Sequence, residues 1–291
     1  MKINQLDLFS GIGGFHLGFE RAGYQVKSFF SEIDKHSIAV YKNKFKNSIY
    51  VGSVTDIQGK ELPTKIDLLT FGSPCQDFSV SSRNRTGMGG ERSSLILEAI
   101  RLIGECRPRV FIWENVKGTF SSNSGEDFAA ILQAFTNIGG YRLEWQLLNT
   151  SWFSRTPQNR ERIYLVGYST TTKRSWRGVF PVGKSSEKNI NIPRQQGNTC
   201  TLTQRYGQAN GNGSYITERK QYAQETNLRI RRLTPIECER LQGFPDNHTE
   251  YGDYDGELIK VSNAQRYRQC GNAVTVDVVQ AIAEKCKTLF K

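Results

Sequence analysis

The chain has 291 residues, enough to bury a full hydrophobic core, and it fits one large domain or one and a half. No run approaches the ~18 consecutive apolar residues of a membrane span, and the N-terminus lacks the basic-then-apolar order of a signal peptide. Six scattered cysteines without a C-x-x-C pair argue against a disulfide framework and against a zinc site. We therefore expect a soluble cytoplasmic protein with reduced thiols and no bound metal.

The net charge of +11 indicates a polyanionic partner, with nucleic acid as the first candidate, although a generally solvated basic surface would give the same total. The distribution of the charge favours the partner. Residues 169–230 carry ten Lys and Arg against three Glu, a net +7. We therefore predict that this part of the chain binds nucleic acid.

The first half of the chain alternates short β-rich runs with helical patterns. Strands are predicted over 3–9, 25–31, 65–71 and 109–113, and helices over 15–22, 34–44 and 93–103. Such an alternation is typical of an α/β fold, with a Rossmann-like, mostly parallel sheet and helices on both of its faces. Ligands of such sheets bind at the carboxyl ends of the strands.

The second half changes in character. Between residues 170 and 224 periodicity fades and Ser, Thr, Asn, Gln and Gly dominate. A disordered insert is one interpretation, but the aromatic residues there favour a small loop-rich, β-containing module. Order returns with a short helix, since Thr234 is a good N-cap, Pro235 suits the first helical position and Glu237 completes a capping box. A last helix is expected after Asn272.

The stretch DLFSGIGG lies where the first strand turns into the first helix. Gly11, Gly13 and Gly14 let the backbone turn tightly and pass close to a ligand, and the N-terminus of the helix favours anionic groups. About 20 residues further on, Glu32 ends the second strand, where a carboxylate can accept hydrogen bonds from both ribose hydroxyls. Glycines alone also suit plain packing, but together with Glu32 they favour an adenosine-containing cofactor.

Cys75 follows the next predicted strand, in the stretch GSPCQ. A thiolate is a strong nucleophile when its pKa is lowered, and a strand end beside basic groups can lower it. A buried core cysteine is the alternative, since free cysteine is among the most buried residue types. A zinc deaminase would place a second cysteine where Phe78 stands, and a papain-like protease would need a partnering histidine. Both of these classes fit poorly.

Polar groups also stand at the following two strand ends. Glu114 ends one strand, and it would line one pocket with Cys75 if the two strands are neighbours, which lie ~4.8 Å apart in a sheet. There the carboxyl can act as an acid or hydrogen-bond donor. Arg160 and Arg162 lie on one side of a strand start, because side chains alternate, and suit phosphate or carboxylate binding. The alternatives are an ordinary polar strand end and an exposed strand edge.

The motifs form a series. The stretches DLFSGIGG, SEID, GSPCQDFS, ENVKG, QNRERIYLVG, RRLTPIECERLQGFP and QCGNAV, in this order, resemble the motifs of the cytosine-C5 DNA methyltransferases. The resemblance covers residues 5–168 and 231–285. It implies a class I methyltransferase fold, with a catalytic and cofactor-binding domain over 1–168, a target-recognition region over 169–230 and a return segment over 231–291.

The resemblance also implies a bacterial or phage enzyme with a specific chemistry. Cys75 would attack C6 of a cytosine flipped out of duplex DNA, and C5 would then take a methyl group from S-adenosylmethionine, leaving S-adenosylhomocysteine. Glu114 would hold the N3 and amine edge of the base, Arg162 would contact its O2 side, and Arg160 would support a phosphate or Glu114. A tRNA cytosine-C5 methyltransferase and a non-catalytic, sequence-specific DNA-binding protein are the alternatives.

By the same resemblance, several stretches of the chain contribute cofactor contacts. The expected cofactor-binding residues are Phe9, Ser10, Gly11, Ile12, Gly13, Gly14, Glu32, Ile33, Ser53, Val54, Asp56, Pro74, Asn272, Ala273 and Val274. The family often has Gly-Asp where Gly52-Ser53 stands here, so Asp56 is the expected substitute at the adenine amino group.

Two further stretches are expected to contact duplex DNA. The residues 79–94 form a Ser/Gly-rich, basic segment typical of a mobile lid. The expected DNA-binding residues are Gln76, Ser79, Ser81, Arg83, Arg85, Thr201, Gln204 and Arg205. The expected protein is a monomer, either paired with a restriction endonuclease or acting alone.

Overall fold

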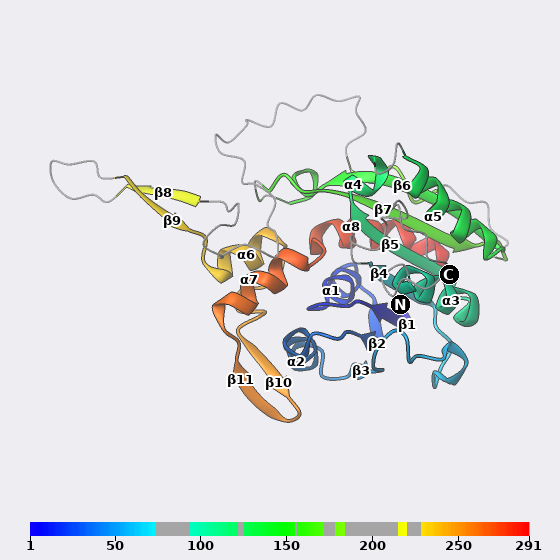
Figure 1. Ribbon diagram of the computed structural model, residues 1–291, viewed down its shortest axis with the longest axis horizontal. Helices are drawn as coiled ribbons and strands as arrows, with labels where there is room; N and C mark the ends of the chain where they lie inside the picture. Colours follow the sequence, from blue (N-terminus) through cyan, green and yellow to red (C-terminus); the bar gives the residue numbers. More distant parts are fainter. Residues whose placement is uncertain are drawn as a thin grey trace, which may run out of the picture.

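The computed structural model describes residues 1–73, 94–121, 125–154, 156, 158–171, 178–183, 215–219 and 228–290. They contain a seven-stranded sheet with the order β3-β2-β1-β4-β5-β7-β6 (Figure 1). The strands are β1 (Lys2–Leu8), β2 (Gln25–Ser31), β3 (Ile49–Tyr50), β4 (Leu68–Gly72), β5 (Val110–Val116), β6 (Tyr141–Asn149) and β7 (Glu161–Ser169). The first five strands of that order pair in parallel, whereas β7 runs antiparallel to both β5 and β6.

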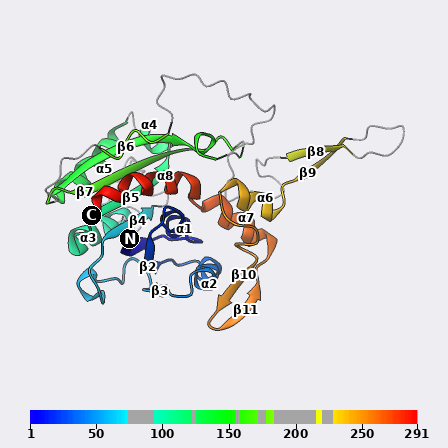
Figure 2. The same ribbon diagram turned by 180° about the vertical axis from the view of Figure 1, so that it is seen from behind.

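Helices cover both faces of this sheet (Figures 1 and 2). One face carries α1 (Gly14–Arg21), α2 (Lys35–Lys44) and α8 (Val276–Cys286), and the other carries α3 (Ser94–Cys106) and α5 (Glu126–Asn137). A short α4 (Gly118–Ser121) follows β5, and 3-10 turns occupy Gly59–Glu61, Thr150–Trp152 and Lys287–Leu289. The predicted Rossmann-like α/β fold is therefore confirmed.

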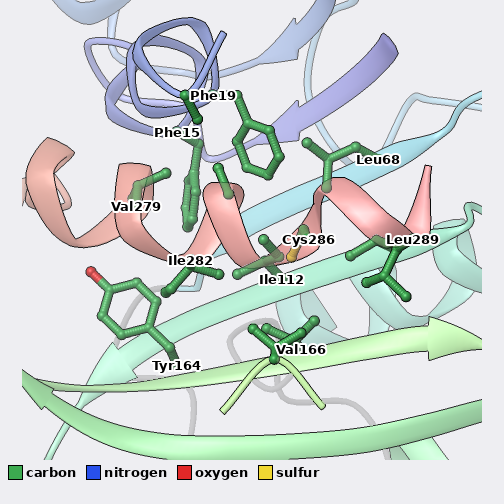
Figure 3. Packing of buried hydrophobic residues seen from close by; sticks show 14 of the residues in the cluster. Phe15, Phe19, Leu68, Ile112, Tyr164, Val166, Val279, Ile282, Cys286 and Leu289 are labelled. Atoms are coloured by element: carbon green, nitrogen blue, oxygen red, sulfur yellow. The ribbon is translucent and has the colours of Figure 1, made fainter. Parts of the chain in front are cut away.

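The two ends of the chain meet in the core on the α1 and α8 face. Phe19 of α1 and Ile282 of α8 pack together over Leu68 and Ile112 of the sheet (Figure 3). The two helices cross closely, because a Cβ at Gly18 would lie only 2.4 Å from Cγ1 of Val279. The C-terminal helix thus packs directly against the helix that follows the glycine-rich loop.

The return segment adds α6 (Pro235–Leu241), α7 (Asn263–Asn272) and the hairpin of β10 (Tyr251–Tyr254) and β11 (Glu257–Lys260), which packs beside α2. The predicted start of α6 is confirmed, because Thr234 and Glu237 form both hydrogen bonds of a capping box. Arg231 binds the same carboxylate and lowers the pKa of Glu237 to about 2. Before this segment, β8 (Tyr215–Arg219) pairs antiparallel with β9 (Leu228–Arg232).

Several elements differ from the prediction. β6, α5, α7 and the β10–β11 hairpin were not predicted, and the last helix begins at Val276 instead of directly after Asn272. Thr275 precedes that helix as its N-cap, with extended backbone. No helix in the described ranges is both long enough and apolar enough to cross a membrane.

Candidate active site

The predicted polar groups gather at one edge of the sheet. In the parallel part, the carboxyl ends of β1 and β2 lie side by side, with Leu8 opposite Ser31, and Gly72 at the end of β4 lies opposite Glu114. Because β7 is antiparallel to β5, its first residues reach the same edge, and Arg162 pairs with Val116. The strands that precede Cys75 and carry Glu114 are therefore neighbours, which was the condition for a shared pocket.

The loop after β1 has an unusual backbone. Phe9, Gly11 and Gly13 have φ angles of 50°, 53° and 83°, all in the left-handed region. The loop is held by the amide of Ser10, which donates to the carbonyl of Ser31 (3.1 Å), and by the amide of Gly13, which donates to that of Ser10 (3.0 Å). A Cβ at Gly11 would meet no atom within 4 Å, so this glycine borders open space that a ligand can enter.

Gly13 and Gly14 are also required by the packing of the protein itself. A Cβ at Gly13 would lie 2.3 Å from the ring of Phe45, and one at Gly14 would lie 2.5 Å from Cγ2 of Val274. Their small size therefore serves protein packing, and their predicted contact with the cofactor stays a prediction. The contact between Gly14 and Val274 brings the first and the last predicted cofactor stretches together, although Asn272 just before it is exposed.

Glu32 connects the first two loops. One carboxylate oxygen accepts a hydrogen bond from the amide of Gly11 (2.9 Å), and the other accepts from the amides of Ile33 (2.8 Å) and Asp34 (3.0 Å). A carboxylate has about four lone-pair positions, so Glu32 can still accept from a ligand. The side chain of Ile33 beside it is 81% exposed and presents an apolar surface.

The stretch after β3 carries the remaining predicted contacts of the cofactor. The hydroxyls of Ser53 and Thr55 lie 3.0 Å apart, and Thr55 donates to the exposed carboxylate of Asp56 (3.0 Å). Val54 is buried in the core of the sheet and its carbonyl accepts from Arg101. Its side chain therefore contributes to the fold, whereas Asp56 presents a carboxylate to solvent.

Glu114 is the central side chain on the other half of the edge. It is only 8% exposed, and its Oε1 lies 3.2 Å from Nε of Arg162, which forms an ion pair with it. The geometry of that pair is not that of a hydrogen bond, and Oε1 accepts none from any described residue. A Cβ at Gly72 would lie 3.1 Å from Oε2 of Glu114, so a glycine opposite leaves room for the carboxylate.

Arg160 contacts the backbone of a distant part of the chain. Its guanidinium is buried and donates to the carbonyls of Gly271 (3.3 Å) and Ala273 (2.9 Å), while the described partner of Glu114 is Arg162. These two hydrogen bonds direct Arg160 toward the segment after α7, and its expected support of a phosphate or of Glu114 stays a prediction. Arg160 thus holds the backbone of the last predicted cofactor stretch.

Ser73 and Asn115 are site residues that the sequence analysis missed, although both stand in the quoted stretches. The hydroxyl of Ser73 accepts hydrogen bonds from Nε1 of Trp113 (3.0 Å) and Nδ2 of Asn115 (3.3 Å). These contacts fix the end of β4, two residues before Cys75.

The predicted residues outside the described part of the chain are Pro74, Cys75, Gln76, Ser79, Ser81, Arg83, Arg85, Thr201, Gln204 and Arg205, together with most of the expected lid.

Unpaired polar atoms mark this edge. Among the described residues, Ser10 Oγ, Glu114 Oε1 and both amide atoms of Gln158 are buried and have no hydrogen-bond partner. Buried polar groups are nearly always hydrogen-bonded, so Ser10 Oγ and Glu114 Oε1 are atoms whose hydrogen bonding a polar ligand could complete. The described ranges hold no cluster of three His, Cys, Asp or Glu that could bind a metal ion.

The fold is that of known methyltransferases. A methyltransferase of Entamoeba histolytica, EhMeth, superposes with a TM-score of 0.75 over 100% of this chain and 99% of that one, at 20% identity. DNMT2 of Spodoptera frugiperda gives a TM-score of 0.73 over 99% and 100% of the two chains, also at 20% identity. The chain therefore has the α/β fold of these two proteins.

Sequence similarity identifies the family to which the chain belongs. Residues 3–201 and 170–288 match the family of the C-5 cytosine-specific DNA methylases. The type II methyltransferase M.Bsp6I of Bacillus sp. (strain RFL6) is 31% identical over 321 residues, covering 95% of this chain and 96% of its own. The type II methyltransferase M.NlaX of Neisseria lactamica is 32% identical over 312 residues, covering 97% and 95%. The chain belongs to this family and is a DNA cytosine-C5 methyltransferase.

Proposed function

We propose that this enzyme uses Cys75 to attack C6 of a cytosine flipped out of duplex DNA, with S-adenosylmethionine as the methyl donor. The observation that carries the proposal is the buried Oε1 of Glu114, which lies beside Arg162 and accepts no hydrogen bond from a described residue. Gly72, at the strand end that leads into Cys75, lies opposite Glu114 in the sheet. A carboxylate oxygen that can still accept a hydrogen bond suits the exocyclic amine of a cytosine.

The residues at the first two strand ends fit the proposed donor. Gly11 borders open space and Ser10 has an unpaired hydroxyl, so both can face a ligand. Glu32 can accept from ribose hydroxyls, the exposed side chain of Ile33 can cover an adenine ring, and the carboxylate of Asp56 can accept from the adenine amino group. When bound, S-adenosylmethionine supplies an electrophilic methyl group.

Three side chains of the protein then take part in the reaction. The Cys75 thiolate forms a bond to C6, which makes C5 enamine-like and able to accept the methyl group. Glu114 holds the N3 and amine edge as charge develops there, and Arg162 balances the carboxylate from 3.2 Å while it faces the O2 side. The later loss of the C5 proton lets Cys75 leave by elimination.

The proposal includes the partner and the setting of the enzyme. Residues 169–230, with their net charge of +7, would bind the target duplex through its phosphates, and residues 1–168 and 231–291 would form the catalytic part. The curated relatives are called type II methyltransferases, which supports a functional pairing with a restriction endonuclease. We also propose a monomer that acts in the cytoplasm.

Methyl transfer itself is tested with radiolabelled S-adenosylmethionine and either duplex DNA or tRNA. We expect label in the DNA only. Label in tRNA only would show that the RNA alternative is right, and label in neither substrate would contradict the proposal. Bisulfite sequencing of a plasmid from the expressing cells would then identify the methylated sequence.

The role of Cys75 is tested by covalent capture on a duplex with 5-fluorocytosine at the target position. The fluorine cannot leave as a proton does, so we expect the wild-type protein to form a stable adduct and Cys75→Ser to form none. Cys106→Ser is a matched control, because burial raises the pKa of the Cys106 thiol to about 11 and makes it a poor nucleophile. An adduct with Cys75→Ser would contradict the assignment.

A further inference from the structure

A histidine from the return segment contacts the glycine-rich loop. His248 is buried, and its Nε2 lies 2.9 Å from the backbone carbonyl of Ile12, 236 positions earlier in the chain. A carbonyl only accepts hydrogen bonds, so Nε2 must carry the proton and donate it. Ile12 stands between Gly11 and Gly13, which both have left-handed backbone angles.

The surroundings of His248 keep its ring neutral and fixed. The ring packs at 4.5 Å from that of Phe244 and at 6.2 Å from that of Phe45, measured between centroids. Burial, and more weakly the charges of Lys44 and Arg21, lowers the pKa of His248 to about 4, against the opposing effects of the Ile12 contact and Glu239. The imidazole is therefore a neutral donor at physiological pH.

The turn that carries His248 is itself held by a buried ion pair. Glu239, which is completely buried, accepts hydrogen bonds from the amides of Asn247 (2.7 Å) and Thr249 (2.9 Å), on either side of His248. Arg266 of α7 donates to the same carboxylate (2.9 Å) and to the hydroxyl of Thr249 (3.0 Å). A buried and fully engaged pair of this kind gives the turn a single geometry, so the ring is presented from a rigid support.

The loop is thus held by hydrogen bonds at two successive residues, Gly11 and Ile12. Glu32, at the end of β2, accepts from the amide of Gly11, and His248 donates to the carbonyl of Ile12. Gly11 and Gly13 adopt left-handed angles without steric cost, but Phe9 does not, and the two contacts help to hold the loop in the conformation that this strained residue requires.

We infer that His248 is a positioning residue for donor binding, because its Nε2 proton holds the Ile12 carbonyl and with it the loop from Phe9 to Gly13. The inference rests on the proposed cofactor site in that loop. His248 does not face the open space next to Gly11, so its effect on the donor passes through the backbone.

Calorimetric titration with S-adenosylhomocysteine tests this inference on the full chain. His248→Phe keeps an aromatic ring but removes the donor, and we expect a dissociation constant at least tenfold above that of the wild type. His248→Gln can place an amide donor near the position of Nε2, and we expect a value within threefold of the wild type. A loss of affinity in His248→Phe that is not restored in His248→Gln would overturn the inference, as would unchanged affinity in His248→Phe.

Tyr24→Phe is the matched control for lost stability. Tyr24 is also buried and donates from its ring hydroxyl to a backbone carbonyl, that of Ala283 (3.0 Å), but at the amino-terminal edge of the sheet. Because this variant loses the same kind of hydrogen bond far from the loop, we expect unchanged affinity. Weakening equal to that of His248→Phe would mean that the effect is general destabilisation, and it would overturn the inference.

A second measurement needs no variant at the site. The chain has three histidines, so the nitrogen resonances of their rings are readily separated by NMR. We expect His248 to be the Nε2-protonated tautomer at neutral pH, and an Nδ1-protonated ring would overturn the inference. If the wild type binds no S-adenosylhomocysteine, the cofactor proposal fails, and the tautomer still decides whether His248 holds the loop.

Discussion

The two halves of the functional edge are built in different ways. On the side of β1 and β2, the site is made of backbone, and its amides and carbonyls are satisfied by Ser31, Glu32 and His248. On the side of β5 and β7, it is made of buried side chains, and Oε1 of Glu114 accepts no hydrogen bond from a described residue. The first half depends on chain conformation and the second on charge, so substitutions should affect them by different mechanisms.

The largest effect is expected at Glu114. Glu114→Gln keeps the volume of the side chain but removes the charge that pairs with Arg162, so we expect methyl transfer to fall about 100- to 1,000-fold. The affinity for S-adenosylhomocysteine should stay unchanged, because the donor would bind at the other half of the edge. Single-turnover transfer and calorimetry measure the two quantities separately.

Glu161→Gln provides the control for this experiment. Glu161 lies at the start of β7 and pairs with Lys117 at 2.9 Å, but it is partly exposed. We expect its transfer rate to remain within twofold of the wild type. An equal loss of transfer in the two variants would mean that removing any negative charge at this edge impairs transfer, contrary to the specific role of Glu114.

The backbone half is probed by comparing two neighbouring glycines. Gly13→Ala would place a methyl group 2.3 Å from the ring of Phe45 and strain a φ of 83°, so we expect the free energy of unfolding to fall by about 3 kcal/mol. Gly11→Ala meets no neighbouring atom, and its positive φ should cost only about 1 kcal/mol.

The affinities of these two variants should follow a different order from their stabilities. Since Gly11 borders the open space, its added methyl group should weaken S-adenosylhomocysteine binding beyond what the small loss of stability explains. Urea denaturation gives the stabilities, and calorimetry gives the affinities. Full affinity in Gly11→Ala would contradict a donor site next to this glycine.

The contrast between the halves also explains what the sequence could predict. The adjacency of the strands that lead to Cys75 and Glu114 was predictable, because apolar runs that end in polar residues mark buried parallel strands and their carboxyl ends. The capping box at Thr234 was predictable because it is local. The β6 strand was not predicted, since its position depends on antiparallel pairing with β7.

Contacts between distant parts of the chain could not be predicted from local sequence patterns. Gly14 makes room for Val274, 260 positions later in the printed sequence, and the local pattern of glycines does not indicate this partner. Arg160 donates to the carbonyls of Gly271 and Ala273, more than 100 positions later, and the local sequence does not indicate these partners. The contact of His248 with Ile12 requires the return segment to lie against the first loop, and no periodicity in either stretch indicates that.

The stability of the protein should depend on pH through the imidazole of His248. The pKa of His248 is lowered from 6.5 to about 4 in the folded protein, so between these values the unfolded chain binds a proton that the folded chain does not. The contribution of this group is full above pH 6.5 and is lost as the pH falls. At pH 5 we expect a loss of about 2 kcal/mol in the free energy of unfolding.

His248→Gln should remove this contribution, because glutamine does not titrate. The difference in the free energy of unfolding between wild type and variant, measured in urea at pH 7 and at pH 5, should therefore shrink by about 2 kcal/mol at the lower pH. Carboxylates common to both proteins cancel in this difference. A difference that stays constant over this range would mean that the imidazole is not buried in its neutral form.

The smallest effect is expected at Ser73, the residue that directly follows β4 and leads toward Cys75. Ser73→Ala removes an acceptor from Trp113 and Asn115, and we expect a loss of about 1 kcal/mol of stability. The rate of adduct formation with 5-fluorocytosine DNA should fall several-fold, since a nucleophile whose support is loosened attacks less often in the right geometry. S-adenosylhomocysteine affinity should not change, because the donor loop is held by other contacts. If affinity fell and the adduct rate did not, Ser73 would belong functionally to the backbone half, and the division of the edge proposed here would be wrong.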